Sequence, residues 1–225
     1  MMARTAAAKA DLSRETIVER ALSIADSEGL AAVTIRRIAV EFGVTPMALY
    51  WHVSNKDELL AAMGDEFFSS LAEIPHHDDW LDELRAIMAA LIESLRRHPA
   101  SAPLAAQRVM SCPAGLELAE RTLSMLLAAG FNQVQTSDIS RTAMQTAVML
   151  VTSEAGSELD VPAEQREDHM LAKRAALAAL PPTSFPSVRA CLEALTDCDD
   201  EQAYYDFGID LFVGGVERLH QRLSA

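Results

Sequence analysis

The sequence has few aromatic residues and no alternating runs of β-branched residues. Aromatics make up 5% of the 225 residues, and Ala, Leu and Met are abundant in their place. These three are strong helix formers, whereas strands favour β-branched and aromatic residues. We therefore expect an all-α protein whose length allows one large domain or two small ones.

Cysteine is also scarce. The three cysteines, Cys112, Cys191 and Cys198, are odd in number and widely spaced, which favours reduced thiols of a cytoplasmic protein. A zinc site would need closer pairs with histidines nearby, so we expect no metal and no other cofactor. No apolar run is long enough to cross a membrane, and residues 1–16 lack the apolar core of a signal peptide. A cytoplasmic protein without a membrane partner is the expectation.

Motifs of common enzyme classes are missing. The chain contains no G-x-S-x-G, no H-E-x-x-H, no phosphate-binding loop and no G-x-G-x-x-G. No cluster of Ser, His and Asp is apparent either. We therefore expect that the protein is not an enzyme.

Acidic residues are unevenly distributed along the chain. The formal net charge is −14, yet residues 1–60 carry seven Lys and Arg against eight Asp and Glu. Almost all of the negative charge therefore lies in residues 61–225. Such an acidic part would repel DNA and leave one end for docking, although acidity that serves only solubility is an equally good explanation.

Helix signals follow one another closely in residues 12–60, which we interpret as one small domain. Ser13 is placed to cap a first helix that ends at Gly29. A fourth helix is predicted to begin after an N-cap at Ser54 and to lead into the rest of the chain. Residues 1–11 are expected to form a disordered arm.

Two short helices are predicted between these. Thr34 caps one helix, which Gly43 ends through a positive φ. Thr45 caps the next, with a proline at its first position, where the missing N–H costs nothing, and this helix runs to Trp51 or His52. Short helices joined by such a tight turn are the outline of a helix-turn-helix.

The remaining residues, 61–225, are expected to form a larger helical domain for ligand binding and dimerisation, joined to the first by the fourth helix. Apolar periodicity between proline and glycine breaks predicts its helices at 79–97, 102–110, 115–129, 137–153, 163–180, 186–195 and 201–223.

Residues 12–62 resemble the tetracycline-repressor (TetR) family. The resemblance lies in Thr34-Ile35-Arg36-Arg37-Ile38-Ala39, Phe42-Gly43-Val44-Thr45-Pro46 and Leu49-Tyr50-Trp51-His52-Val53-Ser54-Asn55-Lys56-Asp57-Glu58-Leu59-Leu60. It is weaker beyond, where Gly130-Phe131 and the stretch from Phe207 to Glu217 are similar to the family's C-terminal domain. The resemblance implies a homodimeric regulator, in most members a repressor, that binds palindromic operator DNA and is released by a small, largely apolar effector.

Residues around the third helix are predicted to contact DNA. Free N–H groups at helix starts attract phosphate, and Lys56 is a cation placed against the local helix dipole, which suggests an external anion. Arg36 is the best candidate for reading a base, as the resemblance also implies. Trp51 is equally well explained by packing. The predicted contacts are Thr34, Arg36, Arg37, Thr45, Pro46, Met47, Ala48, Tyr50, Trp51, His52 and Lys56.

Dimerisation is implied through two helices per chain, at 137–153 and 201–223. Glycines inside a helix are unfavourable, and a close helix crossing would explain those at 208, 214 and 215, although packing within one chain is the alternative. The predicted interface residues are Ala143, Ala147, Val148 and Val151 of the first helix and Phe207, Leu211, Phe212, Gly214, Gly215 and Leu219 of the second.

An effector pocket is implied by the same resemblance, and methionine-rich surfaces adapt to varied ligands. The predicted lining is Met88, Leu91, Leu95, Met110, Leu123, Leu126, Leu127 and Met144. Family members that bind tetracycline with magnesium use two histidines; the corresponding positions here hold Ala72 or Ser69 and Ala105 or Ala106, so we expect no such metal site. His76 and His77 are read as surface residues. A regulator without a ligand and a helical protein-interaction module remain alternatives.

Overall fold

A computed structural model describes residues 12–69, 71–154, 158–159 and 161–223, and the predicted disordered arm at 1–11 lies outside this range. Within the described ranges the chain contains α-helices, short 3-10 turns and loops, but no strand. The all-α prediction is confirmed. No helix among these residues is long and apolar enough to cross a membrane.

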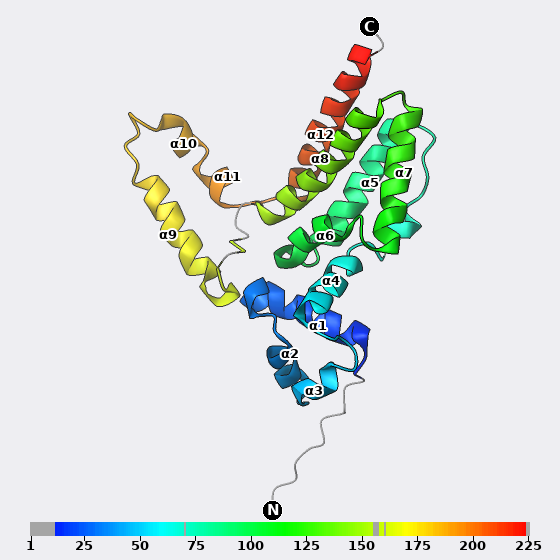
Figure 1. The fold of residues 1–225 in the computed structure, drawn as a ribbon. Helices are drawn as coiled ribbons and strands as arrows, with labels where there is room; N and C mark the ends of the chain where they lie inside the picture. Colours follow the sequence, from blue (N-terminus) through cyan, green and yellow to red (C-terminus); the bar gives the residue numbers. More distant parts are fainter. Residues whose placement is uncertain (1–11, 70, 155–157, 160, 224–225) are drawn as a thin grey trace, which may run out of the picture.

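Four helices build the N-terminal unit at the lower end of the molecule (Figure 1). They are α1 (Arg14–Glu28), α2 (Ile35–Phe42), α3 (Pro46–Leu49) and α4 (Lys56–Glu66), with a 3-10 turn at Leu30–Ala32. Ser13 and Gly29 cap α1 as predicted. Ile17, Ile38, Leu49 and Leu59, one from each helix, are fully buried, so a small apolar core fixes the angles between the helices.

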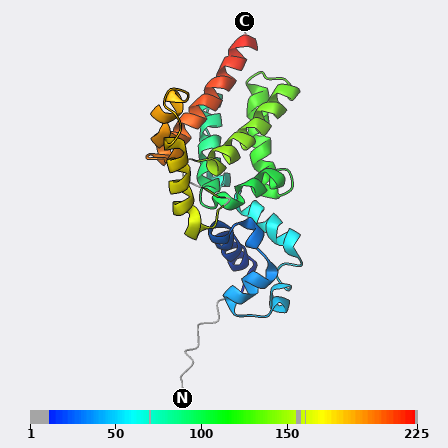
Figure 2. The same ribbon diagram turned by 90° about the vertical axis from the view of Figure 1, so that its left-hand side faces the viewer.

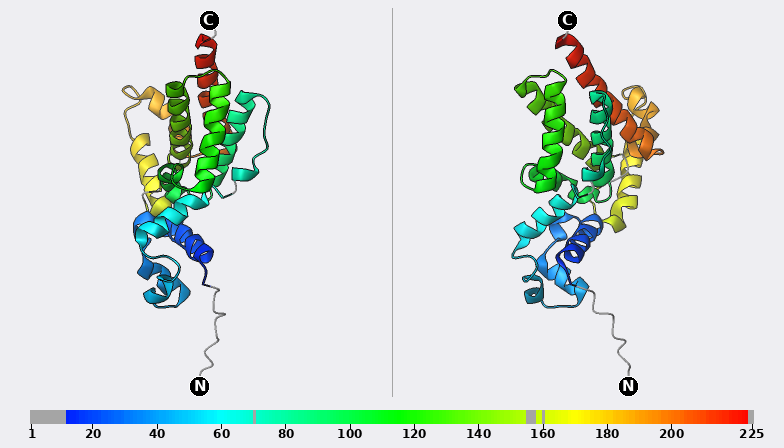
Figure 3. Two further views of the ribbon diagram at one scale, coloured as in Figure 1. Left: turned by 45° about the vertical axis from the view of Figure 1, so that its right-hand side comes forward. Right: turned by 90° about the vertical axis from the view of Figure 1, so that its right-hand side faces the viewer.

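Five longer helices form the body above this unit. They are α5 (Trp80–Leu95), α6 (Ala102–Arg108), α7 (Pro113–Ala128), α8 (Gln133–Thr152) and α12 (Glu201–Leu223). Figure 3 shows α5, α7, α8 and α12 standing side by side, with the N-terminal unit below them in both views. The helix α4 leaves the N-terminal unit and packs on α6, where it makes the most extensive contact between two helices.

A side arm of three short helices stands apart from the body (Figures 1 and 2). It consists of α9 (Arg166–Ala178), α10 (Pro186–Ala190) and α11 (Leu192–Thr196). No residue of α9 or α10 is buried, so these helices contribute little to the core. Its base meets α1, because Arg166 donates a hydrogen bond to the backbone carbonyl of Asp26 at 2.9 Å.

Several predicted boundaries were wrong. The N-cap of α4 is Asn55 and not Ser54, because the Asn55 side chain accepts from the backbone N–H of Glu58 at 2.8 Å. Asn132 caps α8 through a reciprocal capping box with Gln135, so α8 begins four residues before the predicted start. The helix predicted at 186–195 is two helices that break at Cys191.

Candidate nucleic-acid interface

The helix α2 begins as the sequence predicted. Thr34 has extended backbone angles, and its hydroxyl accepts from the backbone N–H of Arg37 at 3.1 Å. Gly43 ends the helix in the left-handed conformation (φ 63°), which favours glycine. The next N–H, of Val44, donates to the carbonyl of Ala39 at 3.0 Å, and the chain then turns into α3. The turn thereby fixes α3 against α2.

The helix α3 is shorter than predicted, and it ends at Leu49 before a turn through Tyr50, Trp51 and His52. Leu49 is fully buried and anchors the helix to the core of the unit. The Thr45 hydroxyl makes no capping bond at the start of α3, so it is available to a phosphate.

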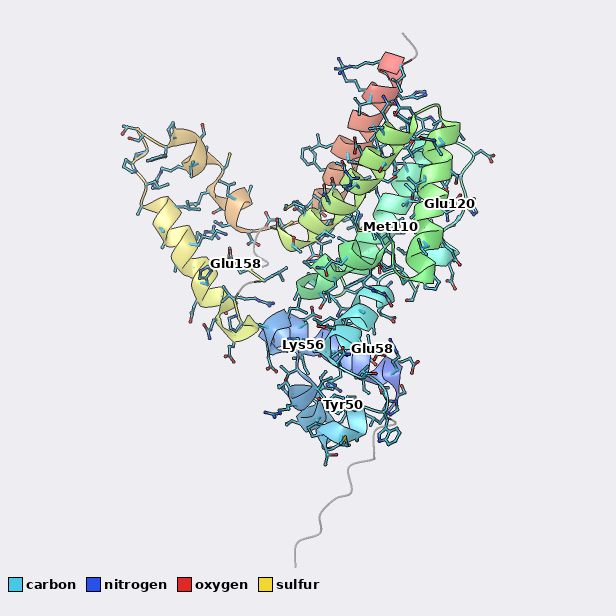
Figure 4. All side chains as sticks on the ribbon, in the orientation of Figure 1. Tyr50, Lys56, Glu58, Met110, Glu120 and Glu158 are labelled. Atoms are coloured by element: carbon cyan, nitrogen blue, oxygen red, sulfur yellow. The ribbon has the colours of Figure 1, made fainter. Side chains whose placement is uncertain are left out.

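Large apolar side chains of α3 and its following turn face solvent. Met47 is 69% exposed and Trp51 87% exposed, although side chains of this size are usually buried in a monomer. Packing, the alternative explanation for Trp51, is therefore wrong. Tyr50 is also exposed, and Figure 4 shows it at the lower end of the unit, away from the body. Pro46 is exposed, and Ala48 and His52 are half-buried.

The two arginines of α2 differ in their surroundings. Arg36 is exposed, and no hydrogen bond or ion pair with another described residue holds its guanidinium. Arg37 lies between Glu28 and Glu41: its Nε is 3.1 Å from both Glu28 carboxylate oxygens, and its Nη1 pairs with Glu41. Hydrogen bonds to Glu28, and then to Glu41, raise the pKa of Arg37. The prediction that Arg37 contacts a phosphate therefore has little support, because two carboxylates already neutralise it.

The start of α4 carries a cation, Lys56. Lys56 is the first residue of the helix, is exposed, and has no ion-pair partner among the described residues (Figure 4). Its neighbour Glu58 is turned inward, accepting from the Ser54 N–H at 2.8 Å and from Arg14 at 2.9 Å. The bond from Ser54 is the main reason that the pKa of Glu58 is lowered. Lys56 therefore has no ion pair among the described residues, although the exposed Asp57 follows it in the first turn.

The predicted dimer residues fall into two groups. Ala143, Ala147 and Val151 of α8 are buried within the chain, so their prediction as a contact with a second chain is wrong. Val148 is half-buried, and its place in an interface stays a prediction. Their helix packs against α5, α6, α7 and α12 of the same chain. On α12 the residues are open to solvent, except for half-buried Phe212; these are Phe207, Leu211, Gly214, Gly215 and Leu219.

The glycines of α12 have different neighbours. A Cβ on Gly208 would lie 2.6 Å from Leu150 of α8, so a close crossing within the chain explains this glycine. Gly214 and Gly215 have nothing within 4 Å of an added Cβ. Packing within the chain therefore explains only the first of the three.

The predicted pocket residues do not surround one cavity. Met88, Leu91, Leu95, Leu126 and Met144 are buried in the core, and Leu123 is half-buried. Met110, at 62% exposed, and Leu127 lie on the surface, so their prediction as lining residues is wrong. Met110 lies in the turn between α6 and α7, and Leu127 lies near the end of α7. His76 and His77 are exposed as predicted, and the described residues contain no metal-ligand cluster.

The sequence analysis did not predict two sets of ion pairs in the N-terminal unit. The clamp of Glu28 and Glu41 on Arg37 had one visible signal, the i, i+4 spacing of Arg37 and Glu41. The pairing of Arg14 with Glu58 joins residues 44 positions apart, and no local pattern could show it.

Two family profiles match the chain. The profile of "Bacterial regulatory proteins, tetR family" matches residues 17–63, and that of "Tetracyclin repressor-like, C-terminal domain" matches residues 74–220. An HTH-type transcriptional regulator from Saccharopolyspora erythraea is 28% identical over 91% of this chain and 84% of its own length. The class C tetracycline repressor from Escherichia coli is 28% identical over 92% of each chain.

Solved structures agree with these profiles. A possible TetR family transcriptional regulator from Streptomyces coelicolor superposes with a TM-score of 0.73 and 25% identity, over 92% of this chain and 100% of that one. The TetR family protein ActR of the same organism, in complex with actinorhodin, superposes with a TM-score of 0.68 and 26% identity, over 94% and 99% of the two chains. The chain therefore belongs to the TetR family of bacterial transcriptional regulators, which bind DNA and are not enzymes.

Proposed function

We propose that this regulator is a repressor that binds a palindromic operator as a homodimer and is released by a small, largely apolar effector. The observation that carries the proposal is the open face of α3 and its following turn. There Met47, Tyr50 and Trp51 are exposed, and Arg36 and Lys56 of the same unit have no ion-pair partner among the described residues. Side chains that serve packing would be covered, whereas side chains that contact DNA must be free.

The roles of these side chains follow from their chemistry. The Arg36 guanidinium can donate two hydrogen bonds to the O6 and N7 atoms of guanine, and the Met47 side chain can contact a thymine methyl. Lys56 and the free hydroxyl of Thr45 would bind phosphates and so fix the register of the unit on the duplex. The excess of acid in residues 61–225 would repel DNA from the body and favour approach through the N-terminal unit.

Dimerisation is supported by the outer face of α12. Phe207 and Leu211 are each 64% exposed, one helical turn apart, and Gly214 and Gly215 continue this side of the helix with open space above them. A second copy that crosses α12 closely at these glycines would cover the apolar side chains. A two-fold dimer would present two α3 helices to successive turns of the major groove, about 34–36 Å apart.

The effector site is proposed within the apolar core of the body. ActR, which superposes on the chain, was solved with actinorhodin and with (S)-DNPA, so a chain of this fold can hold a small molecule. Met88 and Met144 are buried there, and methionine side chains rearrange easily to make room for a ligand. Such a ligand releases DNA only if it binds the DNA-incompetent conformation more tightly.

A gel-shift titration on DNA flanking the regulator's own gene tests the DNA contacts. We expect Lys56→Ala to weaken binding to all sequences alike and Arg36→Ala also to relax sequence choice, by about 1–3 kcal/mol at one base pair. Arg97→Ala, which removes an exposed cation of the body, is the control. Unchanged binding by both variants would overturn the assignment, and a weak dependence of binding on salt would favour a protein partner over DNA.

Light scattering tests the dimer. The double variant Phe207→Lys/Leu211→Lys places two positive charges on the exposed face of α12. We expect this variant to be a folded monomer that binds a single half-site weakly. Leu116→Lys, on an exposed face of α7, is the matched control and should stay dimeric. A double variant that remains a dimer would place the interface elsewhere.

A further inference from the structure

A cavity of about 570 Å³ lies where the N-terminal unit, the body and the side arm meet. This volume is within the usual range for small-molecule sites. None of the eight residues predicted to form the effector pocket lines this cavity. The lining residues are Leu30, Pro99, Ala100, Pro103, Thr152, Ser153, Glu154, Glu158, Leu159 and Lys173.

The lining has an apolar and a polar side. Leu30 follows α1, Pro99 and Ala100 come from the 3-10 turn before α6, and Pro103 belongs to the first turn of α6. The polar groups come from the end of α8 and from the side arm. Figure 4 shows Glu158 between α9 and the rest of the molecule. A ligand that suits this cavity needs an apolar body with a polar or charged group on one side.

Most charges around the cavity are paired. Glu158 Oε1 lies 2.6 Å from Lys173 Nζ, and Glu158 Oε2 lies 3.0 Å from His169 Nδ1. The hydrogen bond from Lys173 is the main reason that the pKa of Glu158 is lowered. Lys173 is therefore already neutralised and is a poor anchor for an anionic ligand.

Glu154 is different, because no cation among the described residues lies within ion-pair distance of it. The partner it has is neutral: the Tyr205 hydroxyl donates to Glu154 Oε2 at 2.7 Å. Burial, and then Glu154 itself, raise the pKa of Tyr205, so this hydroxyl stays protonated. In a neighbouring cavity of about 420 Å³, which also borders Glu154, Arg96 pairs with Glu93 at 2.6 Å. Arg97 and Glu201 also line that cavity, but neither forms an ion pair with Glu154. Glu154 therefore keeps its charge without a direct ion pair among the described residues.

The end of α8 adds to this negative potential. Thr152 is its last residue, and Ser153, its C-cap, also lines the cavity. The last carbonyls of a helix carry partial negative charge and favour a cation. The carboxylate and the helix end are independent features, and both attract the same charge.

The cavity borders contacts that hold the N-terminal unit to the rest of the chain. His98, next to the lining residue Pro99, places its Nδ1 2.7 Å from Asp26 Oδ2 at the end of α1. Arg166 of α9 binds the backbone carbonyl of the same aspartate. The second carboxylate oxygen of Asp26 is buried and has no hydrogen-bond partner in the described part of the chain, so this junction is not fully satisfied there.

We propose that this junction cavity is a ligand site for a monovalent organic cation with an apolar body, whose charge pairs with Glu154. The ligand would touch Leu30 of the N-terminal unit as well as the body and the side arm. Its binding would therefore favour one position of α1 and α3 relative to the body. The site is separate from the apolar core assigned above to the effector, and cation binding to it does not depend on DNA binding.

Calorimetry with two probes of similar shape and opposite charge, tetraphenylphosphonium and tetraphenylborate, tests the inference on the DNA-free protein. We expect the phosphonium to bind at least about tenfold more tightly than the borate. Glu154→Gln keeps an acceptor for Tyr205 but removes the charge, and it should weaken phosphonium binding about tenfold. Ala100→Phe fills the cavity and should abolish binding, whereas Glu167→Gln on α9 should change nothing.

Methyl resonances locate the bound probe. Those of Leu30 and Leu159 should shift on phosphonium addition, and those of Leu211 on α12 should not. Equal affinity for the two probes, absence of phosphonium binding, or a loss with Glu201→Gln in the neighbouring cavity in place of Glu154→Gln would each overturn the proposal. Operator binding is measured separately, so failure of the repressor proposal would be seen independently.

Discussion

A Cβ added to Gly64 of α4 would lie 2.6 Å from Cγ of Arg108 in α6, a distance that real Cβ atoms do not adopt. It would also lie 3.1 Å from the backbone oxygen of Leu104. The adjacent Asp65 holds Arg108 through its Nε at 2.7 Å, which raises the pKa of Arg108. The helix α4 therefore packs closely on α6 at Gly64 and is held there by the ion pair between Asp65 and Arg108.

Gly64→Ala should separate α4 from α6. Alanine gains about 1 kcal/mol of helix propensity, but overpacking against a backbone oxygen and Arg108 costs roughly 1–3 kcal/mol. We expect a melting temperature lowered by about 2–4 °C and weaker operator binding, because α4 sets the position of α3. Glu120→Ala, on an exposed face of α7 away from this crossing, is the control for melting temperature and should not lower it. A Gly64→Ala protein as stable as wild type would show that the crossing is looser than described.

The two tryptophans should respond differently to DNA and to substitution. Trp51 is exposed, whereas the Trp80 ring lies edge-on to Phe131 with centroids 5.7 Å apart and contacts His220. Trp51→Ala should change stability by no more than about 0.5 kcal/mol and still lose operator affinity. Trp80→Ala should cost about 3 kcal/mol.

Tryptophan fluorescence tests the contact of Trp51 with DNA while an aromatic ring is kept at position 51. Operator DNA should change the emission of the wild-type protein, and Trp51→Phe should remove that change. A DNA-dependent signal that survives in Trp51→Phe would place the recognition surface away from α3.

The local signals of the sequence were enough to predict the helix-turn-helix. Thr34, Gly43 and Pro46 act through backbone angles and hydrogen bonds within a few residues of themselves, so their effect can be derived without knowing the fold. Exposure of Trp51 could not be derived in this way. It depends on whether another element covers the ring, and that is settled by tertiary packing.

The helix faces of the body show the same limit. Periodicity identified an apolar face of α8 at Ala143 and Ala147, and the face is buried as such a pattern indicates. Periodicity does not show which partner covers a face, and here α8 packs against other helices of the same chain. Residues of α12 at Phe207 and Leu211 follow an equally apolar pattern and are left open.

The cap of α4 offers a direct comparison between the predicted and the observed residue. Asn55→Ala should lower the free energy of unfolding by about 1 kcal/mol, because it removes the acceptor for the Glu58 N–H. Ser54→Ala should have a smaller effect, because the main contribution of Ser54 is its backbone N–H, which alanine keeps, and its hydroxyl only adds to the bond with Glu58. Chemical denaturation of both variants gives the answer, and a larger loss for Ser54→Ala would restore the cap expected from the sequence.

The buried ion pair of Glu83 and Arg121 should make the free energy of unfolding depend on pH. Glu83 is 4% exposed, and its Oε1 lies 2.6 Å from Arg121, which also donates to the carbonyls of Ile74 and Pro75. The hydrogen bond from Arg121 lowers the pKa of Glu83 below its ordinary value of 4.5. Glu83 therefore stabilises the fold fully above that value, and this contribution is lost as the pH falls through the lower pKa of the folded state.

Arg121→Met should reverse this dependence. The variant leaves a buried carboxylate without its cation, which costs about 3 kcal/mol at neutral pH. Burial then raises the pKa of Glu83, so the cost should shrink as the pH falls and the carboxylate becomes protonated. Urea unfolding between pH 7 and pH 4 should therefore give free energies of unfolding for wild type and Arg121→Met that converge as the pH falls. The double variant Glu83→Gln/Arg121→Met has no carboxylate to titrate at this position, so it should lack this contribution to the pH dependence. Parallel curves for wild type and Arg121→Met would mean that Glu83 is hydrated in solution and that the pair does not hold the loop before α5.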